Sequence, residues 1–213
     1  MWGGGFPGGR ASGHMVGRGA CILVAMLFLA GIVFGAVAVK ALGDDQKAEL
    51  LSYVDALMRG VTRYTEPVKR GAVLQASVLN NLKTAAATWF LGVTVIGMPL
   101  VMAIVFTRGF VLGFTVSFLV EELGYRGLLL SAAAVLPHNL LAVPALLSLG
   151  MMSLSFSFTL VASAGARRGI DFLSQFTRYS LWAMVLTAVI LLSSGIEAIV
   201  TPSILGVVGS RMM

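Results

Sequence analysis

Long apolar runs alternate with polar stretches along this chain, and the longest apolar run lies between Arg126 and Arg167. That segment contains no Asp, Glu, Lys or Arg, and it is interrupted by the polar cluster Leu136-Pro137-His138-Asn139. Because a helix needs roughly 20 consecutive apolar residues to cross the hydrocarbon core, the run is long enough for one crossing with a break, or for nearly two. The pattern predicts a helical protein embedded in a lipid bilayer.

The other apolar runs extend this prediction to an all-α, polytopic bundle of about five transmembrane helices. The expected crossings are residues 20–39, 85–106, 109–122, 128–162 and 179–200. Pro137 and Pro144 each remove a backbone donor from the fourth run, so we expect that helix to break near residue 137, and a re-entrant segment there would give six membrane segments. Pro99 should kink the second crossing.

A polar segment, residues 40–84, separates the first two crossings. Within it, residues 44–59 place apolar side chains at helical spacing: Leu50, Leu51, Val54, Leu57 and Met58. Asp44 or Asp45 is suited to cap the start of such a helix. The segment predicts an amphipathic helix at the membrane interface, which either packs on the membrane domain or offers a surface to a partner.

Both ends of the chain are expected to lie outside the membrane domain, which we place at residues 20–200. Residues 1–19 are rich in glycine and should form a flexible tail, and residues 201–213 should form a C-terminal tail. The first apolar run exceeds the roughly 7–15 residues of a signal-peptide core, so we do not expect cleavage at Ala36-Val37-Ala38.

Composition agrees with a membrane protein and narrows the partners. Hydrophobic residues make up 58% of the chain and charged residues only 11%, whereas soluble domains carry roughly 25% charged residues. The net charge of +6 could attract nucleic acid, but the basic residues lie mainly in short loops between apolar runs. We therefore expect the lipid bilayer, and no nucleic acid, to be the partner of these charges.

The same basic residues predict an orientation. If the N-terminus is cytoplasmic and there are five crossings, most loop arginines fall on the cytoplasmic side: Arg10, Arg18, Arg108, Arg167, Arg168 and Arg178. Arg126 and Arg211 then fall on the outer side, together with the segment 40–84.

Four sequence segments, taken in order, resemble the stage II sporulation protein M family. They are FLAGIVFGA at residues 28–36, FLGVTVIGMPLV at 90–101, RGFVLGFTVSFLV at 108–120 and LPHNLLAVPAL at 136–146. The resemblance extends from the first crossing to the last and leaves out the glycine-rich leader.

The resemblance implies a non-enzymatic, multi-pass protein of the bacterial cell membrane that acts at the sporulation septum during engulfment. Its implied partners are stage II sporulation proteins D and P, which are cell-wall hydrolases. The implied role is that of a scaffold in cell-wall remodelling, which recruits or organises these hydrolases where the membrane advances. The wider family also occurs in organisms that form no spores.

Two pairs of glycines are spaced to let helices approach closely. Gly31 with Gly35, and Gly109 with Gly113, each place small residues four positions apart, a spacing used for helix packing in lipid. We expect these pairs to pack inside one bundle, with a homo-oligomer contact as the alternative.

An enzymatic alternative rests on Glu121, Glu122 and Arg126, which resemble the paired-glutamate and arginine motif of CAAX-type intramembrane proteases. One glutamate would activate water, and the arginine would hold the pair ionised. That family also needs two histidine motifs, and this chain offers only His138 near its apolar core, with Ala134 where the first motif requires Phe. We therefore predict a charged helix end rather than a catalytic site.

His138 and Asn139 are the remaining polar candidates, because polar groups deep in a membrane usually face the protein interior. They could stabilise carbonyl groups released by Pro137 and Pro144, or form a site for an ion or a partner. A broken helix at this cluster would suit a transporter or channel. One histidine with the distant Cys21 cannot form a zinc site, and we predict no metal or other cofactor.

Overall fold

The computed structural model describes residues 8–63, 67–165 and 172–212, and this part of the chain is all helical. Its elements are six α-helices and one short 3₁₀ helix: α1 (Gly8–Lys40), α2 (Asp44–Arg63), α3 (Pro67–Val93), η1 (Val95–Gly97), α4 (Met98–Leu123), α5 (Tyr125–Gly165) and α6 (Phe172–Met212). The all-α prediction is confirmed for the described residues.

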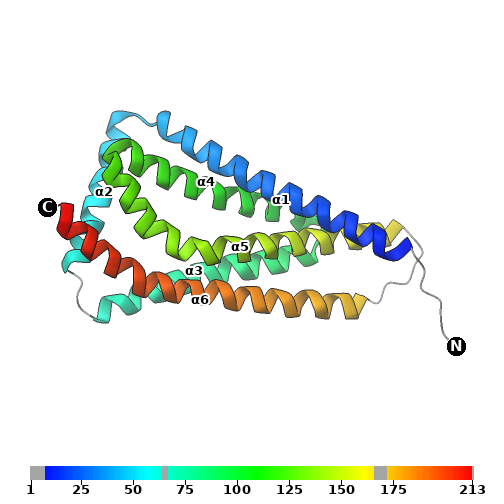
Figure 1. The fold of residues 1–213 in the computed structure, drawn as a ribbon. Coiled ribbons are helices and arrows are strands. Elements are labelled where there is room, and N and C mark those ends of the chain that lie inside the picture. Colours follow the sequence, from blue (N-terminus) through cyan, green and yellow to red (C-terminus); the bar gives the residue numbers. More distant parts are fainter. Residues whose placement is uncertain (1–7, 64–66, 166–171, 213) are drawn as a thin grey trace.

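The long helices lie side by side along a common direction, and α2 crosses one end of the bundle (Figure 1). α1 runs toward the α2 end, and α3, α4, α5 and α6 then run alternately away from it and back to it (Figure 1). α1 packs mainly on α4, while α3 packs on both α5 and α6.

Four described helices contain segments that are long and apolar enough to cross a membrane. These segments are Arg18–Lys40 in α1, Met98–Leu123 in α4, Pro137–Val161 in α5 and Leu173–Ile196 in α6. The prediction of several membrane-spanning helices is thus confirmed, although not with the predicted bounds. α3 is also a long helix of the bundle, but it does not meet the length and hydropathy criterion.

The predicted crossing at 85–106 is wrong, because the chain reverses within it. α3 ends at Val93, and the Thr94 backbone N–H and hydroxyl both donate to the Leu91 carbonyl oxygen, at 3.1 and 3.0 Å. α4 then begins at Met98, with Pro99 in its first turn. A proline there needs no intrahelical donor, so Pro99 starts a helix instead of kinking one.

The predicted short segment 109–122 is also wrong as a separate element. α4 runs without interruption from Met98 to Leu123 and includes Arg108. Sequence reasoning divided the helix at this arginine because it assigned the charge to a loop. The helix instead ends at Gly124, whose positive φ of 57° is a conformation that glycine adopts easily.

The predicted break in the fourth run does not occur either. α5 is one helix of 41 residues that contains both Pro137 and Pro144. Figure 1 shows it bending as it leaves the α2 end, which is the usual response of a helix to an internal proline. One side of this stretch packs against neighbouring helices, where His138, Ala142 and Ala145 are buried, and a bend replaces the re-entrant segment.

The predicted amphipathic helix is present as α2, but its N-cap is Gly43. The Lys47 backbone N–H donates to the Gly43 carbonyl oxygen at 3.0 Å, and the Gln46 Oε1 accepts from the Gly43 N–H at 3.2 Å. This is the backward half of a capping box, and it leaves Asp44 and Asp45 in the first turn, where they favour the positive end of the helix dipole.

The described helices extend beyond the predicted ends of the membrane domain. α1 begins at Gly8, inside the segment 1–19 that was expected to be a flexible tail, and α6 continues to Met212, through the expected C-terminal tail. Residues 1–7 and 213 lie outside the described residues.

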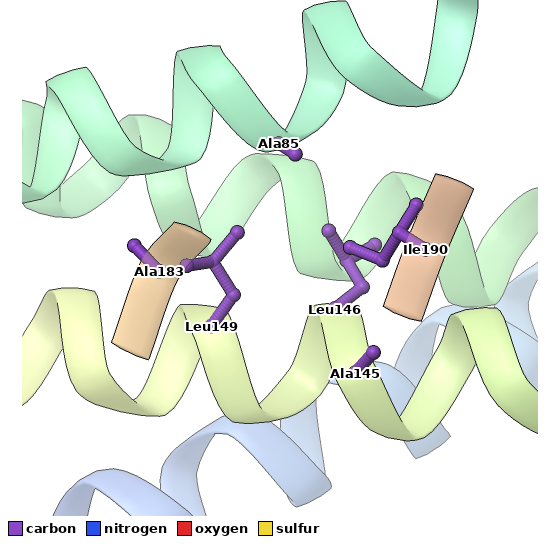
Figure 2. Close-up of a cluster of buried hydrophobic side chains, with 6 residues drawn as sticks. All are labelled: Ala85, Ala145, Leu146, Leu149, Ala183 and Ile190. Carbon is purple, nitrogen blue, oxygen red and sulfur yellow. The ribbon is translucent and has the colours of Figure 1, made fainter. Parts of the chain in front are cut away.

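Three buried clusters hold the bundle together along its length. In the cluster of Figure 2, Ala85 of α3 meets side chains of α5 and α6: Ala145, Leu146, Leu149, Ala183 and Ile190. A second cluster joins α1, α4 and α5 through Ala20, Val24, Val101, Val105 and Leu154. A third lies at the α2 end and consists of Val39, Phe118, Leu119 and Leu130.

Candidate functional site

Polar side chains from three helices meet inside the bundle around His138. The Arg108 Nη2 atom of α4 lies 3.3 Å from the Nε2 atom of His138 and 3.4 Å from the Oδ1 atom of Asn139, both in α5. His138 is only 6% exposed. Arg108 therefore lies within a helix and contacts the predicted polar cluster, so it no longer counts among the loop charges that set orientation.

Ser193 of α6 fixes the other side of the His138 ring. Its Oγ lies 2.8 Å from His138 Nδ1 and also donates to the His138 carbonyl oxygen at 2.8 Å, while the Ser193 carbonyl oxygen lies 3.2 Å from Nδ1. Because a guanidinium only donates, Nε2 must accept from Arg108, and the ring hydrogen then lies on Nδ1 and faces two Ser193 oxygens. These bonds join α4, α5 and α6.

Asn139 makes a second, local bond. Its Nδ2 donates to the Val135 carbonyl oxygen at 2.8 Å. The prolines at 137 and 144 release different carbonyls, those four residues earlier at Ala133 and Leu140. This contact of Asn139 therefore differs from the carbonyl-stabilising contact that the sequence suggested.

α3 contributes to the same level of the bundle. The buried Asn81 donates from Nδ2 to the Oγ of the buried Ser194 at 2.9 Å. Asn81 also lines a cavity of about 10 Å³ together with Arg108 and Thr84, which is close to the volume that one water molecule needs. We call Asn81, Arg108, His138, Asn139, Ser193 and Ser194 the polar layer.

The polar layer lies near the middle of the α1 span. A Cβ added to Gly31 would lie 3.2 Å from the Gly109 Cα atom, and Gly109 follows Arg108 directly. Gly31 is near the centre of the apolar segment Arg18–Lys40. Arg108 likewise lies well inside the α4 segment Met98–Leu123, whereas His138 is the second residue of the α5 segment Pro137–Val161 and Ser194 lies two residues before the end of the α6 segment Leu173–Ile196.

A second set of polar contacts lies nearer the other end of α3. The hydroxyls of Ser153 and Ser157 in α5 donate to the carbonyl oxygens of Thr88 and Gly92 at 3.0 and 2.6 Å, and the Tyr179 hydroxyl of α6 donates to the Trp89 carbonyl oxygen at 3.0 Å. Gly92 belongs to the last turn of α3, where carbonyls have no partner within the helix. These hydroxyls thus anchor the end of α3 inside the bundle.

The two predicted glycine pairs lie opposite each other at the contact of α1 and α4. A Cβ at Gly31, Gly35, Gly109 or Gly113 would lie within 2.1–2.3 Å of a backbone oxygen of the facing helix. All four glycines are buried. The structure uses both pairs within one chain, where they allow the two backbones to touch.

Glu121 and Glu122 lie at the α2 end of the bundle and face Lys47. The Lys47 Nζ is 2.8 Å from Glu121 and 3.5 Å from Glu122. The hydrogen bond to Glu121 raises the pKa of Lys47 above its usual 10.5. On its apolar side, α2 packs Leu50, Leu51 and Val54 against the cluster at this end. The amphipathic helix is therefore docked on the membrane domain.

The residues of the predicted protease alternative do not assemble. Glu121 and Glu122 lie 13 and 14 positions after Arg108 on the same helix, which places them about 20 Å along the axis from the side chain that contacts His138. Arg126 is exposed. The carboxylates and the histidine therefore belong to separate parts of the chain.

The comparisons with known proteins identify the family. The family model described as stage II sporulation protein M matches residues 24–202. The chain belongs to the stage II sporulation protein M family. The resemblance seen in the sequence is confirmed, and the chain is a sporulation-related membrane protein. No curated protein and no solved structure matches it.

The stage II sporulation protein M match includes the whole polar layer and both glycine pairs. Sequence reasoning identified His138 and Asn139 there but missed their contacts with Arg108 and Ser193. It also missed the other polar residues that join helices: Asn81, Ser153, Ser157 and Ser194. Their signal was available as polar residues in otherwise apolar stretches, with Ser153 and Ser157 one helical turn apart. Among the described residues, no group of three or more His, Cys, Asp or Glu side chains could hold a metal ion.

Proposed function

We propose that the chain is a non-enzymatic scaffold that recruits stage II sporulation proteins D and P, the cell-wall hydrolases of engulfment, to the sporulation septum. The observation that carries this proposal is the family match over residues 24–202, which includes nearly the entire bundle. The proposed scaffold role is therefore supported by membership of the family and not by a set of catalytic residues.

The scaffold has five crossings in this proposal, with α3 as the fifth. α3 is too polar to qualify alone, yet Asn81 bonds Ser194 and Thr88 accepts from Ser153, and these serines belong to helices that do qualify. Because α3 contacts membrane-spanning helices from Asn81 to Thr88, this part of α3 lies within the membrane as well in this proposal. Five alternating crossings place the two ends of the chain on opposite sides.

Orientation follows from the basic residues near the start of α1 and of α6, at the end of the bundle opposite α2 (Figure 1). With a cytoplasmic N-terminus, Arg10, Arg18 and Arg178 lie on the cytoplasmic side, in keeping with the excess of positive charge found there. α2 then lies on the outer surface, which faces the peptidoglycan. This is the side on which cell-wall hydrolases act.

α2 is suited to contact a protein on that side. Its inner face is held by the apolar cluster and by Lys47, so the helix has a fixed position. Its outer face exposes Tyr53, which is 67% accessible, beside the exposed acidic residues Asp45 and Glu49. Tyrosine is enriched at protein interfaces, and a docked helix loses little entropy on binding.

The two alternatives lose their structural premises. A protease would need Glu121 and Glu122 beside His138, and they lie apart along α4. A transporter of the predicted kind would need a broken helix at Pro137, and α5 is continuous there.

The proposal is tested by imaging fluorescent fusions of the two hydrolases in the sporulating cell. Deleting this chain should disperse them from the septum, and replacing Tyr53 and Glu49 by Ala and Lys should weaken their recruitment. Arg178→Ala, a charge change at the opposite end, is the matched control and should leave them in place. Septal hydrolases in the deletion strain would reject the scaffold role.

A further inference from the structure

A small cavity inside the bundle is shared by two halves of the polar layer. In one half Arg108 of α4 contacts side chains of α5, and in the other Asn81 of α3 donates to Ser194 of α6. The cavity has a volume of about 10 Å³, and its lining comes from all four of these helices: Asn81, Thr84, Arg108, Ala142, Leu146 and Ile190. A molecule in this cavity is placed to contact both halves at once.

The bond between Asn81 and Ser194 decides which atom of the asparagine amide still needs a partner. The Ser194 hydroxyl has one hydrogen, and it donates this hydrogen to the Ile190 carbonyl oxygen at 3.3 Å. Ser194 must therefore accept from Asn81, whose Nδ2 atom lies 2.9 Å away. Among the described residues this is the one side-chain hydrogen bond of Asn81, which is only 6% exposed. The Asn81 Oδ1 atom is thus a buried acceptor in need of a donor, on a side chain that lines the cavity.

The other two polar side chains of the cavity have fixed hydrogen-bonding roles. The Arg108 guanidinium can only donate, so a molecule that it contacts in the cavity must accept. The Thr84 hydroxyl donates its hydrogen to the Asn80 carbonyl oxygen at 2.9 Å, and its oxygen then acts toward the cavity as an acceptor. A ligand that suits this cavity therefore accepts from one group and donates to two.

We propose that the cavity binds one water molecule, which accepts from Arg108 and donates to Asn81 Oδ1 and Thr84 Oγ1. A buried water typically makes about three hydrogen bonds and needs a cavity of about 10–15 Å³, so both the groups and the volume match. An anion such as chloride would also accept from Arg108, but it has no hydrogen to give to the two acceptor oxygens. The water links the two halves of the polar layer, so that α3 is hydrogen-bonded to α4 as well as to α5 and α6.

Water-edited solid-state NMR of the full chain in lipid vesicles detects such a water directly. With asparagine labelled with ¹³C in the side chain, we expect magnetisation to pass from water to the buried Asn81 amide carbon, whose signal is identified by its absence from Asn81→Ala. Ala142→Val places two methyl groups in the cavity and should abolish the transfer. Ala183→Val is the matched control, because Ala183 is also buried but does not line the cavity.

A double-mutant cycle, measured by unfolding in mixed micelles, tests the bond to Thr84. Thr84→Val should lower the folding equilibrium constant about fivefold more in the wild-type background than in Ala142→Val, which has no water left to lose. Thr84→Ser keeps the hydroxyl and should show no such difference. Thr187→Val is the control: its hydroxyl also donates to the carbonyl four residues earlier, but it lines a groove outside the bundle, so its effect should be equal in both backgrounds.

Absence of transfer from water to Asn81 in the wild-type chain would overturn the water site, and that result does not depend on the folding of any variant. Transfer that persists in Ala142→Val, or an equal effect of Thr84→Val in the two backgrounds, would overturn it as well. Replacing chloride by gluconate in the buffer should change neither measurement. A loss of stability without chloride would assign the cavity to an anion instead.

Discussion

The contact of α1 with α4 and the contact of α3 with α5 and α6 hold helices together in two different ways. α1 and α4 are apolar enough to cross a membrane, and they meet through four buried glycines that bring their backbones together. α3 does not meet the same criterion, and its carbonyls and Asn81 are bound by serine and tyrosine side chains of its neighbours.

The difference shows how a bundle can include a helix that lipid alone would not accept. Lipid tails are as apolar as the side chains of such helices, so the hydrophobic effect does not hold two apolar helices together in a membrane. Close packing of their surfaces does. A helix with a buried asparagine and free carbonyls at its end needs partners for these polar groups, and the hydroxyls of α5 and α6 supply them. We expect the first contact to be sensitive to volume and the second to hydrogen bonding.

The largest effect should come from filling the α1–α4 contact. Gly113→Leu forces a side chain against the Ile32 carbonyl, where even a Cβ would lie at 2.1 Å. We expect a loss of about 3 kcal/mol or more in the free energy of unfolding, since overpacking costs about 1–3 kcal/mol even in cores without backbone contact. Unfolding in mixed micelles would measure it, with Gly19→Leu as the control because no atom lies within 4 Å there.

A smaller loss should follow removal of the central ring of the polar layer. His138→Ala leaves the Ser193 hydroxyl with fewer partners and removes one acceptor of Arg108. A buried polar group left without a hydrogen bond costs about 1–3 kcal/mol. We therefore expect the free energy of unfolding, measured in mixed micelles as before, to fall by about that amount. A stability equal to the wild type would contradict the idea that this layer joins α4, α5 and α6.

The α3 anchor should weaken by small, separable steps. Ser153→Ala and Ser157→Ala each delete one hydroxyl bond to α3, and such bonds in membranes are worth about 0.6 kcal/mol on average and at most about 1.7 kcal/mol. Hydrogen exchange of the α3 backbone amides should accelerate in each variant. Ser155→Ala, on the same helix between them, should change nothing.

The smallest effect should come from Lys47→Ala, which removes the ion pairs of α2 with Glu121 and Glu122 while leaving its apolar contacts. Exchange of α2 amides should rise slightly, and high salt should produce a similar change in the wild type. Because the pKa of Lys47 is raised, the contribution of its ion pairs to stability should persist from neutral pH to about 10.5. It should be lost only as the pH rises through the higher pKa that Lys47 has in the folded protein. Lys40→Ala is the control.

The sequence predicted the class of fold, the family and the amphipathic helix, because each depends on apolar runs and spacing within one segment. It failed where the outcome depends on a neighbouring helix. Arg108 was taken as a loop residue, although His138 and Asn139 from α5 make it acceptable within α4. Pro137 and Pro144 were taken as a break, although the surrounding helices allow α5 to continue with a bend.

The reversal at residues 94–97 was missed for a related reason. The run 85–106 contains no charged residue, so composition alone did not separate the end of α3 from the start of α4. The Thr94 hydroxyl and Pro99 were the local signals, and both are typical of a helix boundary. The serines that bind α3 could be recognised only once the helices were placed side by side.

The central claim, that α3 crosses the membrane, is tested most directly by the sidedness of the two ends of α3. In a chain with Cys21→Ser, single cysteines replace Ser52 on α2 and Ile96, which is 86% exposed in the turn after α3. An impermeant maleimide applied to sealed vesicles should label one position from outside and the other only after the membrane is opened. Labelling of both positions from the same side would show that α3 does not cross, and would contradict the account.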